Sequence, residues 1–547
     1  MLSLLIAHII ITTLCLWSGI LFYKFFPVKS NSRPIIYYLF SGLILLTALT
    51  QILVLFFPIN IYTKIGTICF LILLTLYKRK SPKLFFDRLN LSSSVVFFIL
   101  WLIILVISAG PTIMDDTESY HIQSIKWIEE YGSVPGLANL HERFGFNSSW
   151  FSSVALFSFS SKLTGGFTVL NSVLSMWMCY WFISTFDNRS KENNTQTAFA
   201  ILVTFICCLI IWPLLRGNAA NTNYDFITTC IVLVLFMEMF LSKNITPTIE
   251  WLIWPVYLFT VRIINFPLLL LSVVGLIFFL RQKNLKTLFL PVTFCLLLIV
   301  PFIIRNVIVA GYPFYPSTSF DFTNVDWKAD PQMIERLMEY IKYFNRVNTT
   351  YLEIEQTKAL GANWAPSWFR YLFLFDKALV VFGLIGISMS IGSIFIKKDR
   401  NTTLIAVCVA WLACWFFTAP DPRFVYGILL YGVFLFAYYF ISVIKNKQVI
   451  KGLIDLLLIA LFTTSSYYFI SKLWKEKEYR NWVMPASLPQ PPTKEFVIDG
   501  ITFHIPEQIL NNWNPRCYGT PLPCLYQIDP RLRLRGKKMR SGFRLEK

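Results

Sequence analysis

The chain has 547 residues, of which 56% are hydrophobic and only 14% are charged. Because soluble proteins average about a quarter charged residues, this composition excludes an ordinary soluble protein. The formal net charge of +19 would suit a nucleic-acid-binding protein. Most Lys and Arg residues lie instead in short loops between apolar runs, the distribution that sets topology in membrane proteins, so nucleic acid is not an expected partner.

Apolar runs of about 20 residues recur along the whole chain, and a helix of that length crosses the hydrocarbon core of a bilayer. Runs this long exclude the alternating pattern of a membrane β-barrel. We therefore predict an all-α polytopic membrane protein with about fourteen transmembrane helices. The predicted spans are residues 2–23, 35–57, 61–77, 94–112, 166–186, 198–215, 226–242, 249–262, 264–280, 287–309, 376–396, 402–418, 424–444 and 452–470.

The first apolar run lacks the basic start and the cleavage site of a signal peptide, so it is predicted to be the first transmembrane span. Three parts are expected along the chain. The parts are N-terminal accessory transmembrane helices at 1–93, a transmembrane core at 94–470 with large outer loops at 113–165 and 310–375, and a small mixed α/β extracytoplasmic domain with a basic tail at 471–547.

The basic loops predict the orientation. Clusters of Lys and Arg follow the first, third, ninth, eleventh and thirteenth predicted spans. All of them are cytoplasmic only if both termini lie outside, which predicts a multi-pass inner (cell) membrane protein whose large loops face away from the cytoplasm. The apolar stretch 150–163 is too short for a span, so we expect it to be interfacial or re-entrant.

The first large outer loop carries an acidic pair, Asp115 and Asp116, before a segment with apolar residues at helical spacing that ends at Gly132. This pattern predicts an amphipathic helix lying on the membrane. One carboxylate could take a proton from a hydroxyl and one could hold a divalent cation, with His121 beside them. The alternative is structural: Asp116 caps the helix and Glu118 favours its dipole.

Several arginines lie near the predicted outer ends of spans, where the positive-inside rule disfavours them. Together with Asp225 and Asp421 they suggest a site for a phosphorylated lipid head, since guanidinium binds phosphate through paired hydrogen bonds. The alternative is that they snorkel to the interface. These arginines are Arg143, Arg216, Arg262, Arg305 and Arg423.

The C-terminal tail has three further features. Asp499-Gly500 between β-forming residues predicts a hairpin. Cys517 and Cys524 are predicted to form a disulfide outside the cytoplasm, with free thiols as the alternative, because their spacing has no second half for zinc. The basic end either lies against anionic lipid or glycolipid or is simply solvated. It comprises Arg531, Arg533, Arg535, Lys537, Lys538, Arg540 and Arg544.

The many spans, the acidic pair in the first large outer loop and the helix after it resemble the GT-C superfamily of membrane glycosyltransferases, which use polyprenyl-phosphate-linked sugars. Residues 115–150 look similar to a bacterial family of uncharacterised membrane proteins encoded with surface-polysaccharide genes. The likeness covers about residues 94–547. Its motifs are Tyr120-His121, Trp127-Ile-Glu-Glu-Tyr-Gly132, Pro135-Gly136, Asn139-Leu-His141, Phe146-Asn-Ser-Ser-Trp150, Gly311-Tyr-Pro-Phe-Tyr-Pro316, Ala419-Pro-Asp-Pro-Arg-Phe424 and Leu522-Pro-Cys524.

The resemblance implies that Asp115 or Asp116 is the catalytic carboxylate and that Asp225 is a second acidic position. It leaves open whether a divalent metal ion is needed; Asp116 and Asp225 would be the ligands. The pattern departs from the superfamily in one respect, because the acidic loop usually follows the first span and here follows the fourth.

Together these features predict an inverting glycosyltransferase. It would move a sugar or glycan from a polyprenyl-phosphate carrier to a glycan or glycolipid acceptor at the outer face, in cell-surface polysaccharide synthesis. In this prediction His121, Arg143, Asp225, Arg262, Arg305 and Arg423 bind the substrate or its phosphate. The alternatives are an O-antigen-type polymerase or ligase, which depends more on arginines, and a flippase or transporter of lipid-linked glycans, which usually carries mid-membrane charge.

Overall fold

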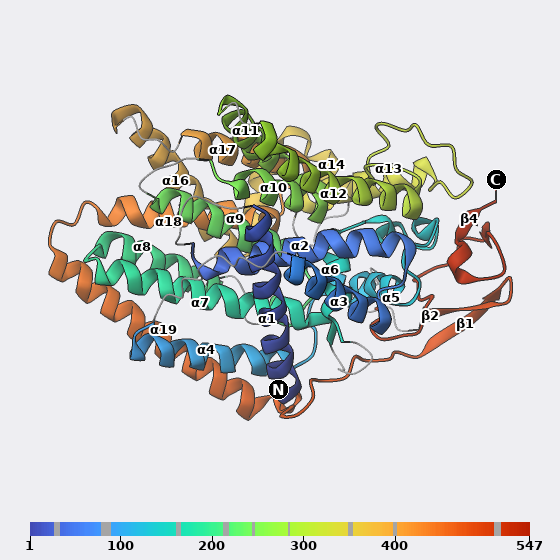
Figure 1. The fold of residues 1–547 in the computed structure, drawn as a ribbon, viewed down its shortest axis with the longest axis horizontal. Helices are drawn as coiled ribbons and strands as arrows, with labels where there is room; N and C mark the ends of the chain where they lie inside the picture. Colours follow the sequence, from blue (N-terminus) through green and yellow to red (C-terminus); the bar gives the residue numbers. More distant parts are fainter. Residues whose placement is uncertain are drawn as a thin grey trace.

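The structure is a computed structural model that describes most of the chain. The described residues are 1–26, 33–77, 89–159, 166–211, 218–242, 247–282, 285–347, 354–397, 402–507 and 516–546. They form a bundle of helices, many of which run along the long axis of the molecule, with the C-terminal strands at one end (Figure 1).

The bundle confirms the prediction of an all-α polytopic membrane protein. Within the described residues, ten helices are long and apolar enough to cross a membrane, and each coincides with a predicted span. They are α1 (Leu2–Phe25), α2 (Ile35–Phe56), α4 (Leu91–Ser108), η4 with α7 (Gly166–Thr168, Val169–Lys191), α9 (Tyr224–Leu241), η7 with α11 (Ile263–Leu268, Leu269–Arg281), α12 (Leu285–Ala310), α16 (Leu374–Lys397), η9 with α18 (Pro422–Val425, Tyr426–Ile441) and α19 (Lys447–Lys475).

Four shorter apolar helices occupy the remaining predicted spans. A full crossing takes about 20 residues, and these helices have fewer, so the number of fourteen crossings stays a prediction. They are α3 (Ile61–Tyr77), α8 with η5 (Thr195–Ile206, Cys207–Ile211), α10 (Ile249–Val261) and α17 (Thr402–Thr418).

Small residues let helix backbones approach closely, as is usual in membrane bundles. Where α1 meets α2, a Cβ added at Gly19 would lie 1.9 Å from the Tyr38 carbonyl oxygen, and one at Gly42 would lie 1.8 Å from that of Cys15. No side chain fits at either position. The N-terminal helices are therefore packed tightly against each other, and α2 also contacts α6, α10 and α12 of the core.

The loop after α4 differs from the sequence expectation. It forms η1 (Thr117–His121) and α5 (Ile122–Glu130), and Gly132 follows with a φ of +76°. The apolar face of α5 is turned into the protein, because Ile125 and Trp127 are fully buried and α5 packs against α6. The amphipathic pattern was read correctly, but protein rather than lipid covers the apolar face.

The stretch expected to be interfacial or re-entrant forms α6 (Ser149–Phe157), whose residues are all buried. At 1.5 Å per residue this helix is about 13 Å long, too short to cross a bilayer. It begins at Ser148, whose side chain accepts a hydrogen bond from the backbone N–H of Trp150 at 3.2 Å. The remainder of the stretch, from residue 160, lies outside the described residues.

The second large loop carries short helices over the same end of the bundle. The longest helix of this loop is α13, which is strongly amphipathic and lies between α12 and α16 in the chain. The elements of the two loops are η2 (Leu137–Asn139), η3 (Glu142–Gly145), α13 (Pro331–Val347), α14 (Ile354–Ala359), η8 (Gly361–Asn363) and α15 (Trp364–Tyr371).

The C-terminal segment contains two small antiparallel sheets. The predicted hairpin is confirmed: β1 (Thr493–Ile498) pairs with β2 (Ile501–Pro506) through Asp499 and Gly500, both at positive φ. The second sheet pairs β3 (Leu532–Leu534) with β4 (Phe543–Leu545).

The expectation of a mixed α/β domain stays a prediction in its helical part, because residues 508–515 lie outside the described residues. Among the described residues after α19, helix is limited to two three-residue 3-10 turns, η10 (Lys477–Tyr479) and η12 (Met539–Ser541). The segment also packs onto the bundle: the N-terminal amine donates to the Asn481 carbonyl at 2.7 Å, and the Ala486 N–H donates to Ala109 at 2.8 Å.

Candidate functional site

A cavity of about 1630 Å³ lies at the end of the bundle where α4 and α10 finish and α9 and η9 begin. Seven of the eight residues predicted to bind substrate or act in catalysis line it. They come from loops far apart in sequence, so their convergence depends on the fold. The seven are Asp115, Asp116, His121, Arg143, Asp225, Arg262 and Arg423.

Asp116 sits between two arginines. One carboxylate oxygen accepts a hydrogen bond from Arg143 Nη1 at 3.2 Å, and the other accepts one from Arg423 Nη1 at 3.2 Å. Charge-assisted bonds of this kind are about twice as strong as neutral ones. The carboxylate is thereby oriented by two elements, η3 and η9, that approach from opposite parts of the chain.

Arg423 extends this arrangement to two further carboxylates. Its Nε lies 3.0 Å from Asp421 and 3.8 Å from Asp225, and Asp225 also pairs with Arg262. The result is a continuous network in which three arginines and three aspartates alternate. A guanidinium carries five N–H donors, and the carboxylates engage only part of this capacity.

Local sequence explains two of these positions. Asp421 caps η9, accepting a hydrogen bond from the Arg423 N–H at 3.0 Å, and Pro422 provides the fixed φ suited to the first helical position. Asp225 lies in the first turn of α9, where the Asn223 side chain accepts its N–H at 2.8 Å. The Ala419–Phe424 motif therefore aims Arg423 through its own cap.

The capping explanation for Asp116 is not supported by its contacts. Asp116 stands at the N-cap of η1 but makes no side-chain capping hydrogen bond. Its carboxylate goes to the arginines instead. Burial raises the pKa of this carboxyl, but Arg423 and Arg143 outweigh burial and lower the pKa to about 2. Asp116 is therefore ionised at all physiological pH values.

His121 is neutral in this setting. Burial, reinforced by Arg423 and Arg143, lowers the pKa of its imidazole to about 3. Its Nδ1 lies 3.2 Å from the Thr222 hydroxyl, while its Nε2 has no hydrogen-bond partner among the described residues. In a neutral ring one nitrogen donates and the other accepts, so Nε2 keeps one hydrogen bond that a ligand could take.

Aromatic rings stack on the arginines and limit their movement. The Arg262 guanidinium lies 3.6 Å from the centre of the Phe424 ring, and Arg143 lies 5.5 Å from that of Tyr120. Arg143 also lies 5.9 Å from the ring of Tyr340, on α13. Such contacts hold a planar cation without neutralising it.

One side of the cavity is apolar and exposed. Its lining includes Phe266, Phe373 and Phe417, whose exposed fractions are 48%, 60% and 69%. They come from η7, the start of α16 and the end of α17, next to helices with lipid-length apolar surfaces. The cavity therefore connects a charged interior with an apolar rim.

Arg305 is the predicted residue that does not line the cavity. It is 6% exposed within α12, and its Nη1 donates to the side chain of Asn147, which does line the cavity. Arg305 supports the wall. Arg216 falls outside the described residues.

Arg516 is a site residue that was not predicted from the sequence. This side chain pairs with Asp115 and lies 2.9 Å from Glu118, so it covers the outer side of the acidic loop. Asp115 itself is exposed over 68% of its side chain, in contrast to Asp116. The sequence feature that could have identified Arg516 is its position directly before Cys517, which was predicted to be disulfide-bonded.

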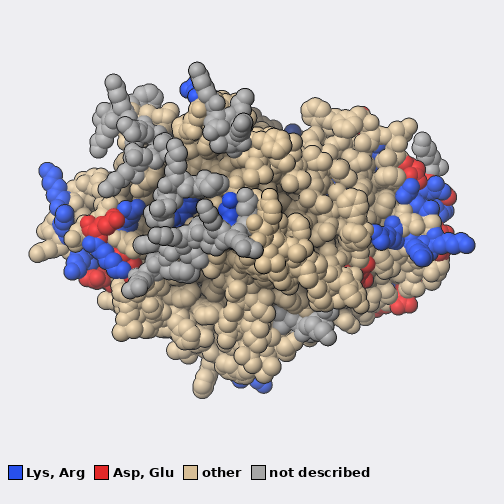
Figure 2. Space-filling view, in the orientation of Figure 1, with Lys and Arg blue, Asp and Glu red and all other residues tan. Residues whose placement is uncertain are grey.

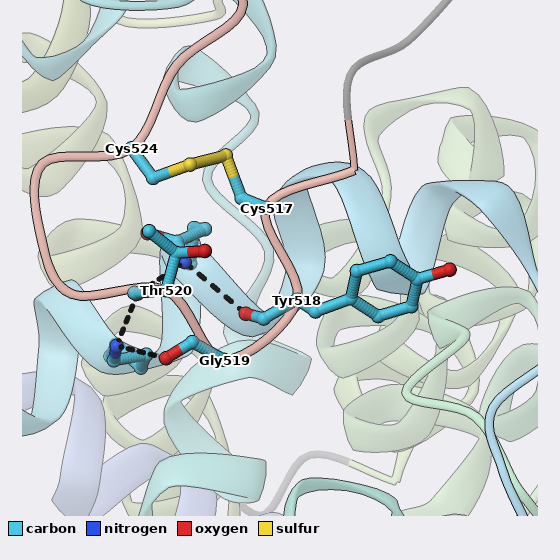
Figure 3. Close-up of a disulfide and its surroundings, with 7 residues drawn as sticks. Cys517, Tyr518, Gly519, Thr520 and Cys524 are labelled. Atoms are coloured by element: carbon cyan, nitrogen blue, oxygen red, sulfur yellow. Dashed lines mark hydrogen bonds between the residues drawn. A yellow bond between two sulfur atoms is a disulfide. The ribbon is translucent and has the colours of Figure 1, made fainter. Parts of the chain in front are cut away.

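The predicted disulfide between Cys517 and Cys524 is confirmed, with a Cα–Cα distance of 5.9 Å. The turn that it closes rests on α5, where Gln123 and Lys126 donate to the carbonyls of Tyr518, Gly519 and Thr520 (Figure 3). The Tyr518 N–H also donates to the Glu118 carbonyl at 2.8 Å. The disulfide therefore fixes Arg516 against the acidic loop.

Metal ligation was left open in the sequence. Within the part of the chain that the structure describes, no group of three or more His, Cys, Asp or Glu side chains is arranged to hold a metal ion. Asp116 and Asp225 both pair with Arg423, whose Nη1 lies 3.2 Å from Asp116 Oδ2 and whose Nε lies 3.8 Å from Asp225 Oδ2.

The fold and the site define a polytopic membrane protein with a charged cavity at one end of its helix bundle. The chain belongs to the family described as "Domain of unknown function (DUF8201)", which matches residues 1–430. The match includes α1, α2 and α3 as well as the cavity residues up to Arg423, so the N-terminal helices are part of the family's domain. No curated protein and no solved structure matches the chain.

Proposed function

We propose that this protein is a GT-C-type, inverting glycosyltransferase. It moves a sugar or glycan from a polyprenyl-phosphate carrier to an acceptor hydroxyl at the outer face of the inner membrane, in cell-surface polysaccharide synthesis. The observation that carries the proposal is Asp116, held between Arg143 and Arg423 inside a cavity that has an apolar rim.

The cavity suits a donor that is part lipid and part phosphate. Arginines bind phosphate oxygens through paired hydrogen bonds, and Arg143, Arg262 and Arg423 all line the cavity. The exposed phenylalanines of the lining offer an apolar surface for the lipid chain of such a donor. A free nucleotide-sugar would use the arginines but would leave the apolar rim without a role.

In the proposed reaction, the acceptor oxygen attacks the anomeric carbon of the donor. The bond between that carbon and the phosphate oxygen breaks, and both of its electrons leave with the phosphate. Asp116 takes the proton of the attacking hydroxyl. Arg423 and Arg143 stabilise the charge on the departing polyprenyl phosphate, a role that is worth roughly 3 to 4 kcal/mol per donor in dry sites.

The low pKa that Arg423 and Arg143 give Asp116 makes it a weak base by itself. A phosphate bound to Arg143 and Arg423 adds negative charge beside the carboxylate and competes for the same donors. Both effects raise the pKa of Asp116. The donor therefore activates the base when it binds.

Asp116 is preferred to Asp115 as the base because of their different contacts. Asp115 is largely exposed and paired with Arg516 of the C-terminal segment. Asp225 has a positioning role, since it holds Arg262 and Arg423 together. If a divalent cation takes part, Asp116 and Asp225 would bind it in place of Arg423, with which both are paired.

The test is surface-glycan analysis in cells whose own gene copy is deleted. Wild type restores the mature polysaccharide, Asp116→Asn does not, and Asp115→Asn restores it in part. Asp321→Asn is the matched control, because that exposed carboxylate pairs with Lys328 outside the cavity. Normal polysaccharide with Asp116→Asn, at equal protein level, would rule out the proposed base.

A further inference from the structure

A basic turn joins β3 to β4 at the end of the molecule, where Lys and Arg side chains gather on the surface (Figure 2). Four arginines of this hairpin have acidic partners. Arg535 lies 2.9 Å and Arg544 3.8 Å from Asp326, while Arg531 pairs with Asp529 at 2.8 Å. The fourth is Arg533, which lies 3.2 Å from Glu546.

Three cations of the same hairpin have no acidic partner among the described residues. They are Lys537, Lys538 and Arg540, and all fall between the two strands. Lys537, Lys538 and Arg540 are exposed. The hairpin is thus neutralised at its base and carries three uncompensated charges at its tip.

The tip of the hairpin contacts the C-terminal end of α2. Arg540 Nη2 donates to the Phe56 carbonyl at 2.6 Å, at the last residue of α2. Around this point Phe57, Ile61 and Tyr62 are exposed by 56%, 57% and 80%. Large apolar side chains exposed at the ends of apolar helices mark the depth at which hydrocarbon gives way to headgroups.

The hairpin is held rigidly in this place. The Phe543 N–H donates to the Pro135 carbonyl at 2.9 Å, and Phe543 is fully buried. A Cβ at Gly542 would lie 2.3 Å from the same carbonyl oxygen, and one at Gly136 would lie 2.0 Å from the Phe543 carbonyl oxygen. Only glycine permits this approach, so the hairpin is fixed against the loop at Pro135 and Gly136.

We propose that the tip formed by Lys537, Lys538 and Arg540 is a binding surface for the anionic phospholipid headgroups of the membrane that the chain itself spans. Basic residues next to a membrane surface each contribute about 1 kcal/mol of attraction to anionic lipid. Their place beside exposed apolar residues at the end of α2 decides for a lipid surface rather than a soluble anion. The proposal does not depend on the sugar chemistry.

The experiment measures amide hydrogen exchange in full-length protein reconstituted in nanodiscs of phosphatidylcholine alone or with phosphatidylglycerol. The peptide covering 535–542 is expected to exchange on the order of tenfold more slowly with the anionic lipid. The effect disappears in Lys537→Ala/Lys538→Ala/Arg540→Ala and at high salt, which screens surface charge. Lys537→Arg/Lys538→Arg keeps it.

Two controls separate this surface from other effects. Exchange of the β3 and β4 amides stays the same in all variants, which checks the fold of the hairpin. Lys445→Ala/Lys447→Ala/Lys451→Ala removes the same charge from exposed lysines around the start of α19 and leaves the protection of 535–542 unchanged. Equal exchange in the two lipid compositions would overturn the proposal, as would protection by added soluble glycerol phosphate alone.

Discussion

Arg33 and Glu250 form an ion pair at one end of the helix bundle, and Arg423 and Asp116 form one at the other. The two ends are linked by α10, which begins next to Glu250 and finishes before Arg262. At the Glu250 end, Tyr23 donates to the same carboxylate and the side chain has no exposed surface. At the Asp116 end, a cavity of about 1630 Å³ opens onto the network.

The comparison teaches that a buried ion pair is not by itself a functional site. Tyr37 and Tyr23 pack over Arg33, with ring centres 5.4 and 5.3 Å from the guanidinium. Arg33 Nε and Glu250 Oε2 are nevertheless buried without a hydrogen-bond partner among the described residues, so this pair also has unused hydrogen-bonding capacity. Around Arg423, three carboxylates, exposed rim residues and an unpaired imidazole nitrogen face the same open space. Access to an open cavity, rather than spare hydrogen-bonding capacity, distinguishes the two ends.

The largest expected effect is on catalysis at the open end. Arg423→Lys keeps the charge but loses the fork that reaches Asp116 and Asp421 together, so the turnover rate should fall by about 10²- to 10³-fold. Arg370→Lys, on the exposed face of α15, is the matched control and should keep the wild-type rate. A lysine variant at position 423 that turns over normally would show that the fork is not needed.

At the closed end the expected effect is on stability. Glu250→Gln leaves Arg33 buried without its partner, which should cost about 3–5 kcal/mol of folding free energy and lower the melting temperature in detergent. Activity per folded molecule should not change. Arg33→Met/Glu250→Met removes both charges and should be less destabilised than the single variant. Equal melting of wild type and Glu250→Gln would mean that the pair contributes no stability.

The pH dependence sharpens the comparison further. The pKa of Asp116 is lowered from 3.8 to about 2, so its ion pairs stabilise the protein fully above about pH 4 and lose this contribution as the pH falls towards 2. The melting-temperature difference between wild type and Asp116→Asn should therefore be constant from pH 5 to 8 and shrink below pH 4. A difference that already changes between pH 6 and 7 would assign a higher pKa to the carboxyl.

The smallest expected effect concerns the C-terminal clamp. Arg516→Ala should lower activity by about three- to tenfold, because exposed ion pairs are weak and Asp115 is not the proposed base. Cys517→Ser/Cys524→Ser should match it, since the disulfide holds the turn in place. Arg531→Ala, at a surface pair away from the acidic loop, is the control. A complete loss in Arg516→Ala alone would place Arg516 among the catalytic groups.

Much of the fold could be predicted from hydropathy. Every predicted span coincides with a helix, because the length of an apolar run is set by the bilayer. The convergence of Asp116, Asp225, Arg262 and Arg423 also followed, since the positive-inside rule placed their helix ends on one side. The Asp499-Gly500 turn was predictable because few other sequences adopt positive φ twice in succession.

Other features depend on tertiary contacts that no local pattern contains. The sequence does not say which of Asp115 and Asp116 is held between Arg143 and Arg423, since adjacent side chains point in different directions. It could not place Arg516 beside an acidic loop some 400 residues earlier. It also could not tell whether α5 would be covered by lipid or by α6, because both surfaces are apolar.

The most direct test of the central claim is release of polyprenyl phosphate by purified protein in liposomes, across a panel of polyprenyl-phosphate-linked sugars. Wild type and Glu250→Gln, compared at equal folded protein, are expected to release it, and Asp116→Asn to release it at least about 10²-fold more slowly. Equal rates in wild type and Asp116→Asn, or no release by wild type from any donor, would contradict the assignment of the open end as a glycosyltransferase site.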